Sequence, residues 1–275
     1  MRRPWYASAL LYGALTAAAV VITFPFVWLV LTALKPYAEI YAFPLTYWPK
    51  TITFEHFRYV LDLNFGRYFL NSVIVGLGTG VMSVLIAVLP AYATARIRFP
   101  GRKAMLLSIL VCQMFPQIVF VVPLLLTLRA LNLTNTYLGI IVSYLPFTTP
   151  IGVWLIRNFF MEIPGELEEA AQIDGCSRLQ VLRRVVLPLA LPGIASVGIY
   201  AFLWSWSELM FAMSFLTSER MQTIPAFLSL FVGQYQTRWG PLFAGSVLAS
   251  LPPMVMFLFL QRYFIQGLTS GSVKG

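Results

Sequence analysis

The chain has 275 residues, of which 59% are hydrophobic and only 11% carry a charged side chain. A water-soluble protein needs about 25% charged residues to cover its surface, so the composition excludes a soluble globular fold and indicates a lipid environment. The net charge of +9 does not indicate nucleic-acid binding. The lysines and arginines lie between long apolar segments, where such residues orient helices in a membrane.

Six apolar segments are long enough to cross a bilayer, which takes about 20 residues. Backbone polar groups in lipid must be satisfied within the segment, so each segment is predicted to be an α-helix. The first is too long for the apolar part of a signal peptide and is predicted to be retained. The predicted spans are residues 8–34, 69–95, 104–128, 137–160, 189–215 and 241–262. The predicted fold class is an all-α integral membrane protein with six transmembrane helices in a single domain, residues 1–275.

The distribution of basic residues predicts the orientation of these spans. The sharpest signal is RIRFPGRK, residues 96–103, because this short basic loop adjoins two helix ends. With the N-terminus inside, the cytoplasmic segments carry most of the 19 lysines and arginines, namely Arg2, Arg3, Arg96, Arg98, Arg102, Lys103, Arg157, Arg178, Arg183, Arg184, Arg262 and Lys274. Both termini and the loop 161–188 are therefore predicted to be cytoplasmic.

Prolines interrupt several of the predicted spans. Each removes a backbone donor and tends to kink a helix. They are Pro25, Pro90, Pro116, Pro123, Pro146, Pro150, Pro252 and Pro253. Two interpretations stay open: ordinary membrane-helix prolines, or broken helices around a cavity that opens alternately to each side.

One polar stretch, PGELEEAAQIDGCSRLQVLRRVVLPLALPG at 164–193, separates two apolar spans. Pro164 starts a short helix with an acidic first turn, which suits the positive end of the helix dipole. Gly175 fits the position after the helix end, where φ is positive. Ser177, with Gln180 three residues later, matches a capping box that starts a second helix. This pair of helices at the membrane surface is either a capped connector or a docking surface for a cytoplasmic partner.

The residues of this stretch resemble the EAA signature of ABC importer permeases. The matching residues are EAA at 169–171, glycine at 175 and LP at 187–188, with Val185 where that family usually has isoleucine. The C-terminal sequence WGPLFAGSVLASLPPMVMFLFLQRYFIQGLTSGSVKG is similar to the end of the smaller permease subunit of maltose-type sugar importers. The resemblance covers essentially the whole chain and implies the type I ABC importer permease fold.

The resemblance also implies partners and roles. The partners are a second, homologous permease subunit, two ATP-binding subunits that hold ATP and magnesium, and an extracytoplasmic sugar-binding protein that delivers substrate to the loop near 217–240. The chain itself is expected to bind no cofactor. The loop would form a coupling helix in a cleft of the ATP-binding subunit, and the tail residues Gly271 and Lys274 would reach toward the ATP-binding dimer. The residues assigned to coupling are Glu168, Glu169, Ala170, Ala171, Asp174, Gly175, Leu187 and Pro188.

Glu208 is the one acidic residue well inside a predicted span. A charge there costs about 2.5–3.5 kcal/mol, so it should face the bundle interior. Trp204 lies one helical turn earlier on the same face, and an aromatic ring beside an acid suits a sugar, whose C–H face stacks and whose hydroxyls need acceptors. The alternative is that Glu208 joins helices by a hydrogen bond. Other polar residues in the spans either line the substrate pathway or pin helices: Gln113, Gln117, Tyr144 and Asn158.

No catalytic set is visible in the sequence. The phosphate-binding pattern G-x-x-x-x-G-K-[ST] is missing, and His56 is the only histidine, so no metal site is expected. The sequence therefore predicts a non-catalytic, multi-pass permease subunit of an ATP-driven ABC importer for a di- or oligosaccharide, in contact with cell-membrane lipid and with no nucleic acid. Two alternatives stay open: an ABC permease for another solute, such as a glycerol phosphate, polyamine or amino acid, and an autonomous secondary transporter or channel.

Overall fold

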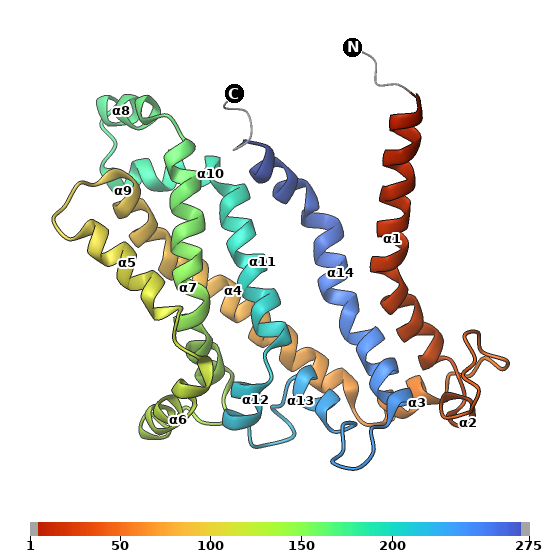
Figure 1. The fold of residues 1–275 in the computed structure, drawn as a ribbon. Helices are drawn as coiled ribbons and strands as arrows, with labels where there is room; N and C mark the ends of the chain where they lie inside the picture. The colour runs from red at the N-terminus through yellow and green to blue at the C-terminus, as the bar shows by residue number, and fades with distance from the viewer. Residues whose placement is uncertain (1–4, 271–275) are drawn as a thin grey trace. The chain divides into compact units, whose positions relative to one another are not determined.

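The computed structural model describes residues 5–270, and the regular elements in this part of the chain are helices (Figure 1). Only an isolated bridge between Val232 and Thr237 has β geometry there. The chain divides into two compact units, residues 1–66 with 227–251 and residues 67–226 with 252–275. The prediction of an all-α protein is confirmed.

The first unit is dominated by one long apolar helix. Its elements are α1 (Trp5–Ala33), α2 (Tyr37–Ile40), α3 (Glu55–Asp62), the end of α13 (Ile224–Ser229) and the first part of α14 (Trp239–Ser270). The segment Ser8–Ala33 of α1 has a mean hydropathy of 2.3, and none of its most apolar window is buried. A helix that is apolar on every side and has no protein cover is suited to lipid.

Buried polar groups fix the chain after α1. Lys35 is buried, donates from Nζ to the carbonyl oxygen of Thr46, and lies 4.7 Å from the ring centre of Trp28. This cation–π contact and the hydrogen bond compensate for the loss of water around the ammonium. His56 hydrogen-bonds through Nε2 to the carbonyl oxygen of Lys35 at 2.9 Å. A β-carbon at Gly240 would lie 2.4 Å from His56 Nε2, so α14 meets α3 here only because residue 240 is glycine.

The second unit holds the remaining elements. They are α4 (Phe65–Arg96) from residue 67 on, α5 (Arg102–Cys112), the 3₁₀ helix η1 (Gln117–Phe120), α6 (Val121–Ala130), α7 (Tyr137–Glu162), α8 (Gly165–Ile173), α9 (Arg178–Val181), the π-helical turn η2 (Leu182–Val186), α10 (Leu187–Leu189), α11 (Leu191–Ser207), α12 (Met210–Phe215), the start of α13 and the end of α14. In Figure 1, α7 and α11 run side by side over most of their length.

Small residues let α4, α7 and α11 pack closely. A β-carbon at Gly152 of α7 would lie 2.9 Å from Val197 Cγ1 on α11 and 3.3 Å from Ala87 Cβ on α4. The buried hydroxyls of Ser83 and Thr148 join α4 to α7 at 2.7 Å. Close backbone approach and hydrogen bonds between helices are the usual means of helix association in lipid.

Two of the six predicted spans are not continuous helices. The four helices long and apolar enough to cross a bilayer alone are Ser8–Ala33, Phe65–Arg96, Tyr137–Glu162 and Trp239–Leu258. In the predicted span 104–128, Arg102–Cys112 and Gln117–Ala130 meet at 94°, and Pro116, which has no N–H to donate, lies at the break. The predicted span 189–215 is interrupted at Glu208 and Leu209, between α11 and α12. A second bend, of 77°, separates Arg178–Leu189 from Leu191–Ser207, so the described residues hold four candidate spans, or six if each bent pair is one span.

Candidate functional site

The loop predicted to couple to a partner lies at one end of the second unit. It consists of α8 and a second helical stretch made of α9, η2 and α10. In Figure 1, α8, α9 and α10 gather there, and α6 and α12 lie at the other end of that unit. Two large apolar side chains of α8, Leu167 and Ile173, are 46% and 86% exposed. An apolar surface on a polar loop indicates a protein or membrane contact.

The end of α8 has the left-handed backbone that the sequence predicts at Gly175. Its φ is +86°, and no atom lies within 4 Å of the place where a β-carbon would stand, so the constraint is conformational and not steric. The amide of Cys176 donates to the carbonyl oxygen of Ala171, and that of Gly175 to Gln172, each at 3.0 Å. This pair of bonds is the Schellman motif, which satisfies the last carbonyls of a helix when the following residue takes a left-handed conformation.

The predicted capping box starts the second helix. The Ser177 amide donates to Gln180 Oε1 at 2.7 Å, and the Gln180 amide donates to Ser177 Oγ at 3.4 Å. The helix then loosens into the π-helical turn η2, where Leu187 donates to the carbonyl oxygen of Leu182, five residues back. Pro188 follows and has no N–H, which removes the next ordinary helical bond.

The predicted coupling residues divide into an inward and an outward group. Glu168 and Ala171 are buried at 6% and 8% exposure, and Leu187 is partly buried. The other five are exposed: Glu169, Ala170, Asp174, Gly175 and Pro188. Spacing of three residues places the two buried members of α8 on one face, so the opposite face is free for a partner.

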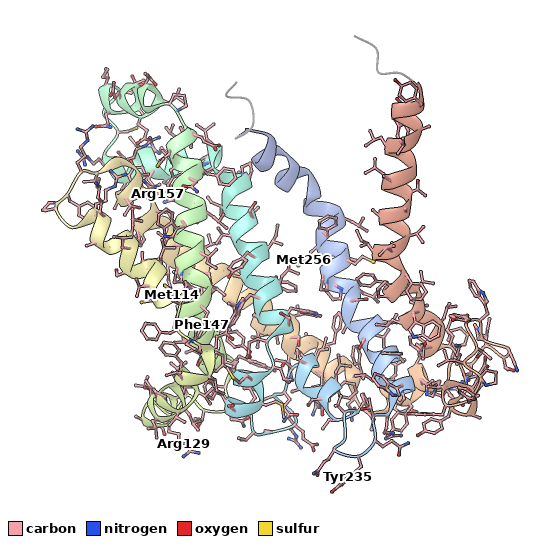
Figure 2. The ribbon with its side chains drawn as sticks, in the orientation of Figure 1. Met114, Arg129, Phe147, Arg157, Tyr235 and Met256 are labelled. Carbon is pink, nitrogen blue, oxygen red and sulfur yellow. The ribbon has the colours of Figure 1, made fainter. Side chains whose placement is uncertain are left out.

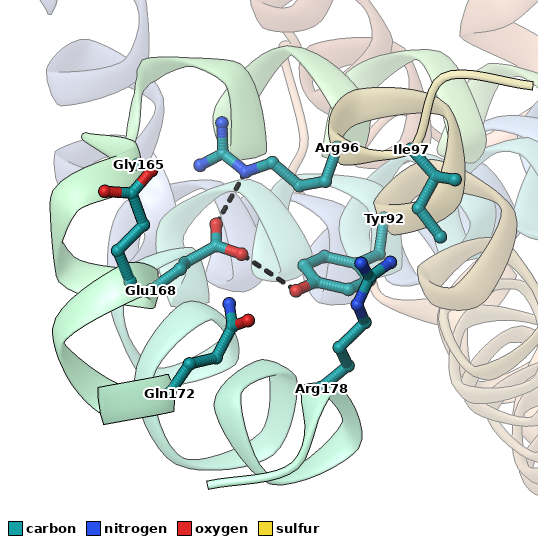
Figure 3. Close-up of a pocket in the computed structure, with 8 residues that line it drawn as sticks. Tyr92, Arg96, Ile97, Gly165, Glu168, Gln172 and Arg178 are labelled. Atoms are coloured by element: carbon teal, nitrogen blue, oxygen red, sulfur yellow. Dashed lines mark hydrogen bonds and ion pairs between the residues drawn. The ribbon is translucent and has the colours of Figure 1, made fainter. Parts of the chain in front are cut away.

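Glu168 is held by two side chains of α4 (Figure 3). Tyr92 donates its hydroxyl to Oε2 at 2.8 Å, and Arg96 donates Nε–H to Oε1 at 2.5 Å. Arg96 also donates from Nη2 to the carbonyl oxygen of Ile163 at 2.7 Å, at the end of α7. An open pocket beside this group is lined by further polar residues of the loop, Glu169, Gln172 and Arg178. The carboxylate thus joins α4 to α8, and its cation joins α4 to α7.

Glu208 lies at the other end of the second unit, at the break between α11 and α12. It is 8% exposed and accepts hydrogen bonds from the Tyr144 hydroxyl at 2.8 Å and from the amides of Phe211 and Ala212 at 2.9 and 3.1 Å. The two amides belong to the first turn of α12, whose N–H groups have no partner within the helix. Glu208 therefore caps the start of a new helix. The sequence predicted instead that Glu208 lies inside one continuous span, 189–215.

An aromatic cluster surrounds this carboxylate. Trp204 stacks on Phe147, which Figure 2 labels on α7, at 5.6 Å between ring centroids and 9° between ring planes. Trp204 also meets the edge of Tyr144 at 5.2 Å, and Phe211 stacks on Phe147 at 5.3 Å. The structure brings the predicted pair Glu208 and Trp204 together with Tyr144, but the amides of α12 and the Tyr144 hydroxyl occupy the Glu208 oxygens, and Phe147 covers a face of Trp204. This geometry favours the alternative in which Glu208 joins helices.

The other predicted pathway residues do not gather at this site. Gln113 donates from Nε2 to the carbonyl oxygens of Pro146 and Phe147 at 3.4 and 3.2 Å. Pro150 cannot donate to Pro146 within α7, so Gln113 supplies that missing bond. Gln117 and Asn158 are exposed on η1 and α7. The predicted tail contacts Gly271 and Lys274 lie outside the described residues.

Sequence reasoning missed the groups that hold the coupling loop in place. The sequence predicts only that Arg96 belongs to a basic loop and that Tyr92 belongs to an apolar span. Neither has a sequence signal for its contact with Glu168, because that contact joins residues more than 70 positions apart. Leu167 and Ile173 did carry a signal, since they are apolar residues on an otherwise polar helix.

Comparison with known proteins gives matches that cover most of the chain. The family described as binding-protein-dependent transport system inner membrane component matches residues 83–270. The diacetylchitobiose uptake system permease protein DasC of Streptomyces coelicolor is 35% identical over 255 residues, which cover 92% of this chain and 92% of that protein. The trehalose/maltose transport system permease protein MalG of Thermococcus litoralis is 34% identical over 270 residues, 97% of this chain and 96% of that protein.

A solved structure has a similar fold. One chain of a bacterial ABC transporter involved in the import of the acidic polysaccharide alginate matches with a TM-score of 0.80 at 22% sequence identity. The match covers 96% of this chain and 99% of that chain. The loop 161–188 lies within residues 83–270, which the family model matches.

Proposed function

The chain belongs to the family of binding-protein-dependent transport system inner membrane components, and on that premise we propose that it is the permease subunit of an ATP-driven importer for a di- or oligosaccharide. The observation that carries this proposal is α8, which presents exposed Leu167 and Ile173 beside Glu169, Ala170 and Asp174. Such a face on a short, capped helix suits insertion into a cleft of a cytoplasmic ATPase.

The chain is a membrane protein with the type I ABC importer permease fold, a transport component and not a catalyst. Beyond this, we propose the six predicted crossings, of which 104–128 and 189–215 are bent or interrupted, and cytoplasmic termini in a multi-pass plasma-membrane protein. The basic residues support this orientation, because Arg96, Arg157 and Arg178 lie at the α8 end of the second unit.

The proposed assembly has four kinds of partner. A second, homologous permease completes the pathway, two ATP-binding subunits hold ATP and magnesium and supply the hydrolysis, and an extracytoplasmic binding protein delivers the sugar. Lipid covers the exposed apolar surface, of which α1 is the clearest part. The tail contact of Gly271 and Lys274 with the ATP-binding dimer is part of the same proposal.

Carbohydrate is the proposed solute class because the two relatives described above are permeases for diacetylchitobiose and for trehalose and maltose. Glu208, Trp204 and Tyr144 are proposed to shape the wall of the pathway rather than to hold the sugar by themselves. Gln113, Gln117 and Asn158 are further candidates for that wall.

The test is sugar-stimulated ATP hydrolysis by the purified complex with its binding protein in proteoliposomes. Diacetylchitobiose, trehalose and maltose are compared with glycerol 3-phosphate, spermidine and histidine. We expect at least one sugar to stimulate hydrolysis and to accumulate inside the vesicles, and none of the other three solutes to do so. Transport by the chain alone, without ATP, would instead identify a secondary carrier.

Topology is tested by cysteine labelling in sealed cells. A membrane-impermeant maleimide should reach cysteines placed at Thr53 and Gln236, and should miss one placed at Ser177, unless the membrane is opened. Both native cysteines, Cys112 and Cys176, are replaced first. Labelling of position 177 from outside would contradict the proposed orientation and the docking of α8 with an ATPase.

A further inference from the structure

We propose that Tyr92, Arg96 and Glu168 form a clamp that makes α8 and the last turn of α4 move as one body, so that these three are positioning residues for coupling. The proposal rests on the proposed function and goes beyond it, since it states through which helix the motion of α8 enters the membrane.

The contacts of the clamp all cross between helices. Glu168 is the only member on α8, and both of its side-chain donors come from α4, where Tyr92 and Arg96 are one helical turn apart. No other side-chain partner of this carboxylate is found among the described residues. The loop can therefore leave α4 only by breaking both bonds together.

Burial makes this separation unfavourable. The side chain of Glu168 is 7% exposed and that of Arg96 is 21% exposed, so water and salt screen the pair only weakly. Withdrawing Arg96 would leave a buried carboxylate without its cation, which is far less favourable than losing an exposed ion pair. The clamp should accordingly stay closed while the rest of the transporter changes state.

Contacts around the clamp attach α7 to the same rigid group of helices as α4 and α8. Arg96 Nη2 donates to the carbonyl oxygen of Ile163, the residue that directly follows α7. Tyr92 packs edge-on against Phe160 of α7 at 5.9 Å between ring centroids. Ala171 of α8 and Val181 of α9 are buried in the same cluster. A push on the outer face of α8 therefore reaches α4 and α7 directly, and is not absorbed by the two-residue link between α7 and α8.

The first experiment measures sugars transported per ATP hydrolysed by the whole complex, with diacetylchitobiose, trehalose and maltose each as solute. The variants are Glu168→Gln, Arg96→Gln and the conservative Arg96→Lys, with Glu162→Gln as the control for loss of an exposed carboxylate nearby. We expect the two glutamine variants to lower the ratio at least tenfold, equivalent to about 1.4 kcal/mol of coupling. The double glutamine variant should be no worse than either single one, because the pair acts as a unit. Arg96→Lys, which keeps the positive charge beside Glu168 but cannot keep both bonds of the guanidinium, should recover part of the ratio, and Glu162→Gln should match the native complex.

The second experiment measures the motion itself. Spin labels on cysteines at Arg98, beyond α4, and at Glu166, on the exposed side of α8, report the distance between the two elements by pulsed electron resonance in complexes with Cys112 and Cys176 replaced. We expect one narrow distance that is the same without nucleotide and with a non-hydrolysable ATP analogue, and a broad distribution in Glu168→Gln.

Two outcomes would overturn the clamp, and a third would count against the proposed function. A native distance that changes with nucleotide would overturn the clamp, because α8 would then move independently of α4. An unchanged transport ratio in glutamine variants that only melt at lower temperature would overturn it too, and would leave the pair a purely structural role. Failure of the native complex to respond to any of the three sugars would count against the proposed carbohydrate function instead, while the distance measurement would still report on the clamp.

Discussion

Glu168 and Glu208 are both buried glutamates of the second unit, one at each end, and the structure holds them in different ways. Each accepts a hydrogen bond of 2.8 Å from a tyrosine hydroxyl. Glu168 also faces the guanidinium of Arg96, whereas no ion pair of Glu208 is present among the described residues. The remaining hydrogen bonds of Glu208 come from two backbone amides of α12.

The difference shows what each carboxylate does for the fold. Every side-chain partner of Glu168 is on another helix, so Glu168 ties separate elements together. Most of the bonds of Glu208 go to the helix that follows it, so Glu208 allows the chain to end α11 and start α12 inside an apolar cluster. The cation of Arg96 thus joins helices that are distant in the sequence, whereas the backbone amides at Glu208 set the direction of the chain between two consecutive helices.

The largest effect is expected from removing the cation. Arg96→Met leaves the Glu168 carboxylate buried beside Tyr92 alone, and breaking a buried ion pair in this way costs about 3–5 kcal/mol. The melting temperature of the purified complex should drop strongly. The double variant with Glu168→Met should regain most of the loss, because an apolar pair of similar volume needs no solvation. A double variant as unstable as the single one would show that the ion pair is not the origin of the loss.

Glu208→Gln is expected to have a smaller effect. The amide keeps one acceptor but turns an NH₂ group toward a backbone N–H of α12, and a buried donor without an acceptor costs about 1–3 kcal/mol. The melting temperature should fall while the half-saturating sugar concentration for stimulated ATP hydrolysis stays unchanged. Leu209→Met, a neutral change at the neighbouring half-exposed position, is the control.

The opposite result would assign Glu208 to the sugar. A half-saturating concentration raised about ten- to a hundredfold at an unchanged melting temperature is what the loss of a charged hydrogen bond to the substrate would produce. That outcome would contradict the comparison drawn above, since Glu208 would then bind a ligand as well as shape the chain.

The sequence predicts features that depend on neighbouring residues, and it misses those that depend on how helices meet. The glycine turn at Gly175 and the capping box of Ser177 and Gln180 were predicted correctly, because each depends on residues within a few positions. The attachment of Glu168 to Arg96 was not predicted, because it depends on how α4 and α8 meet. The break at Glu208 was missed for a related reason. The sequence there is apolar enough for a span, and only the folded structure shows that the Glu208 carboxylate accepts the amides of Phe211 and Ala212 in place of helical carbonyl oxygens.

Gly175→Ala tests whether backbone geometry, as well as the ion pair, fixes α8. At a φ of +86° a side chain costs about 1–2 kcal/mol, so the Schellman motif should weaken and the end of α8 should fray. Hydrogen exchange at the Gly175 and Cys176 amides should speed up. Gly165→Ala, at a glycine of the same helix with open space and no positive φ, should leave both exchange rates unchanged. Equal effects at the two glycines would mean that the left-handed conformation is unimportant.

Tyr92→Phe should have the smallest effect on stability. Together with Tyr144→Phe, it compares directly how Glu168 and Glu208 are held. Without the Tyr92 hydroxyl, Glu168 keeps the guanidinium of Arg96, which still balances its charge, so the loss should be below the about 1.5–3 kcal/mol of a hydrogen bond to a charged group. Without the Tyr144 hydroxyl, Glu208 loses its only side-chain donor among the described residues, and the loss should be nearer the about 1.5–3 kcal/mol of a bond to a charged group. Thermal melting of the two phenylalanine variants, each of which keeps the ring and its packing, measures both. A larger loss at Tyr92 than at Tyr144 would mean that Arg96 does not hold Glu168 by itself, and the contrast between an ion-paired and a backbone-capped carboxylate would fail.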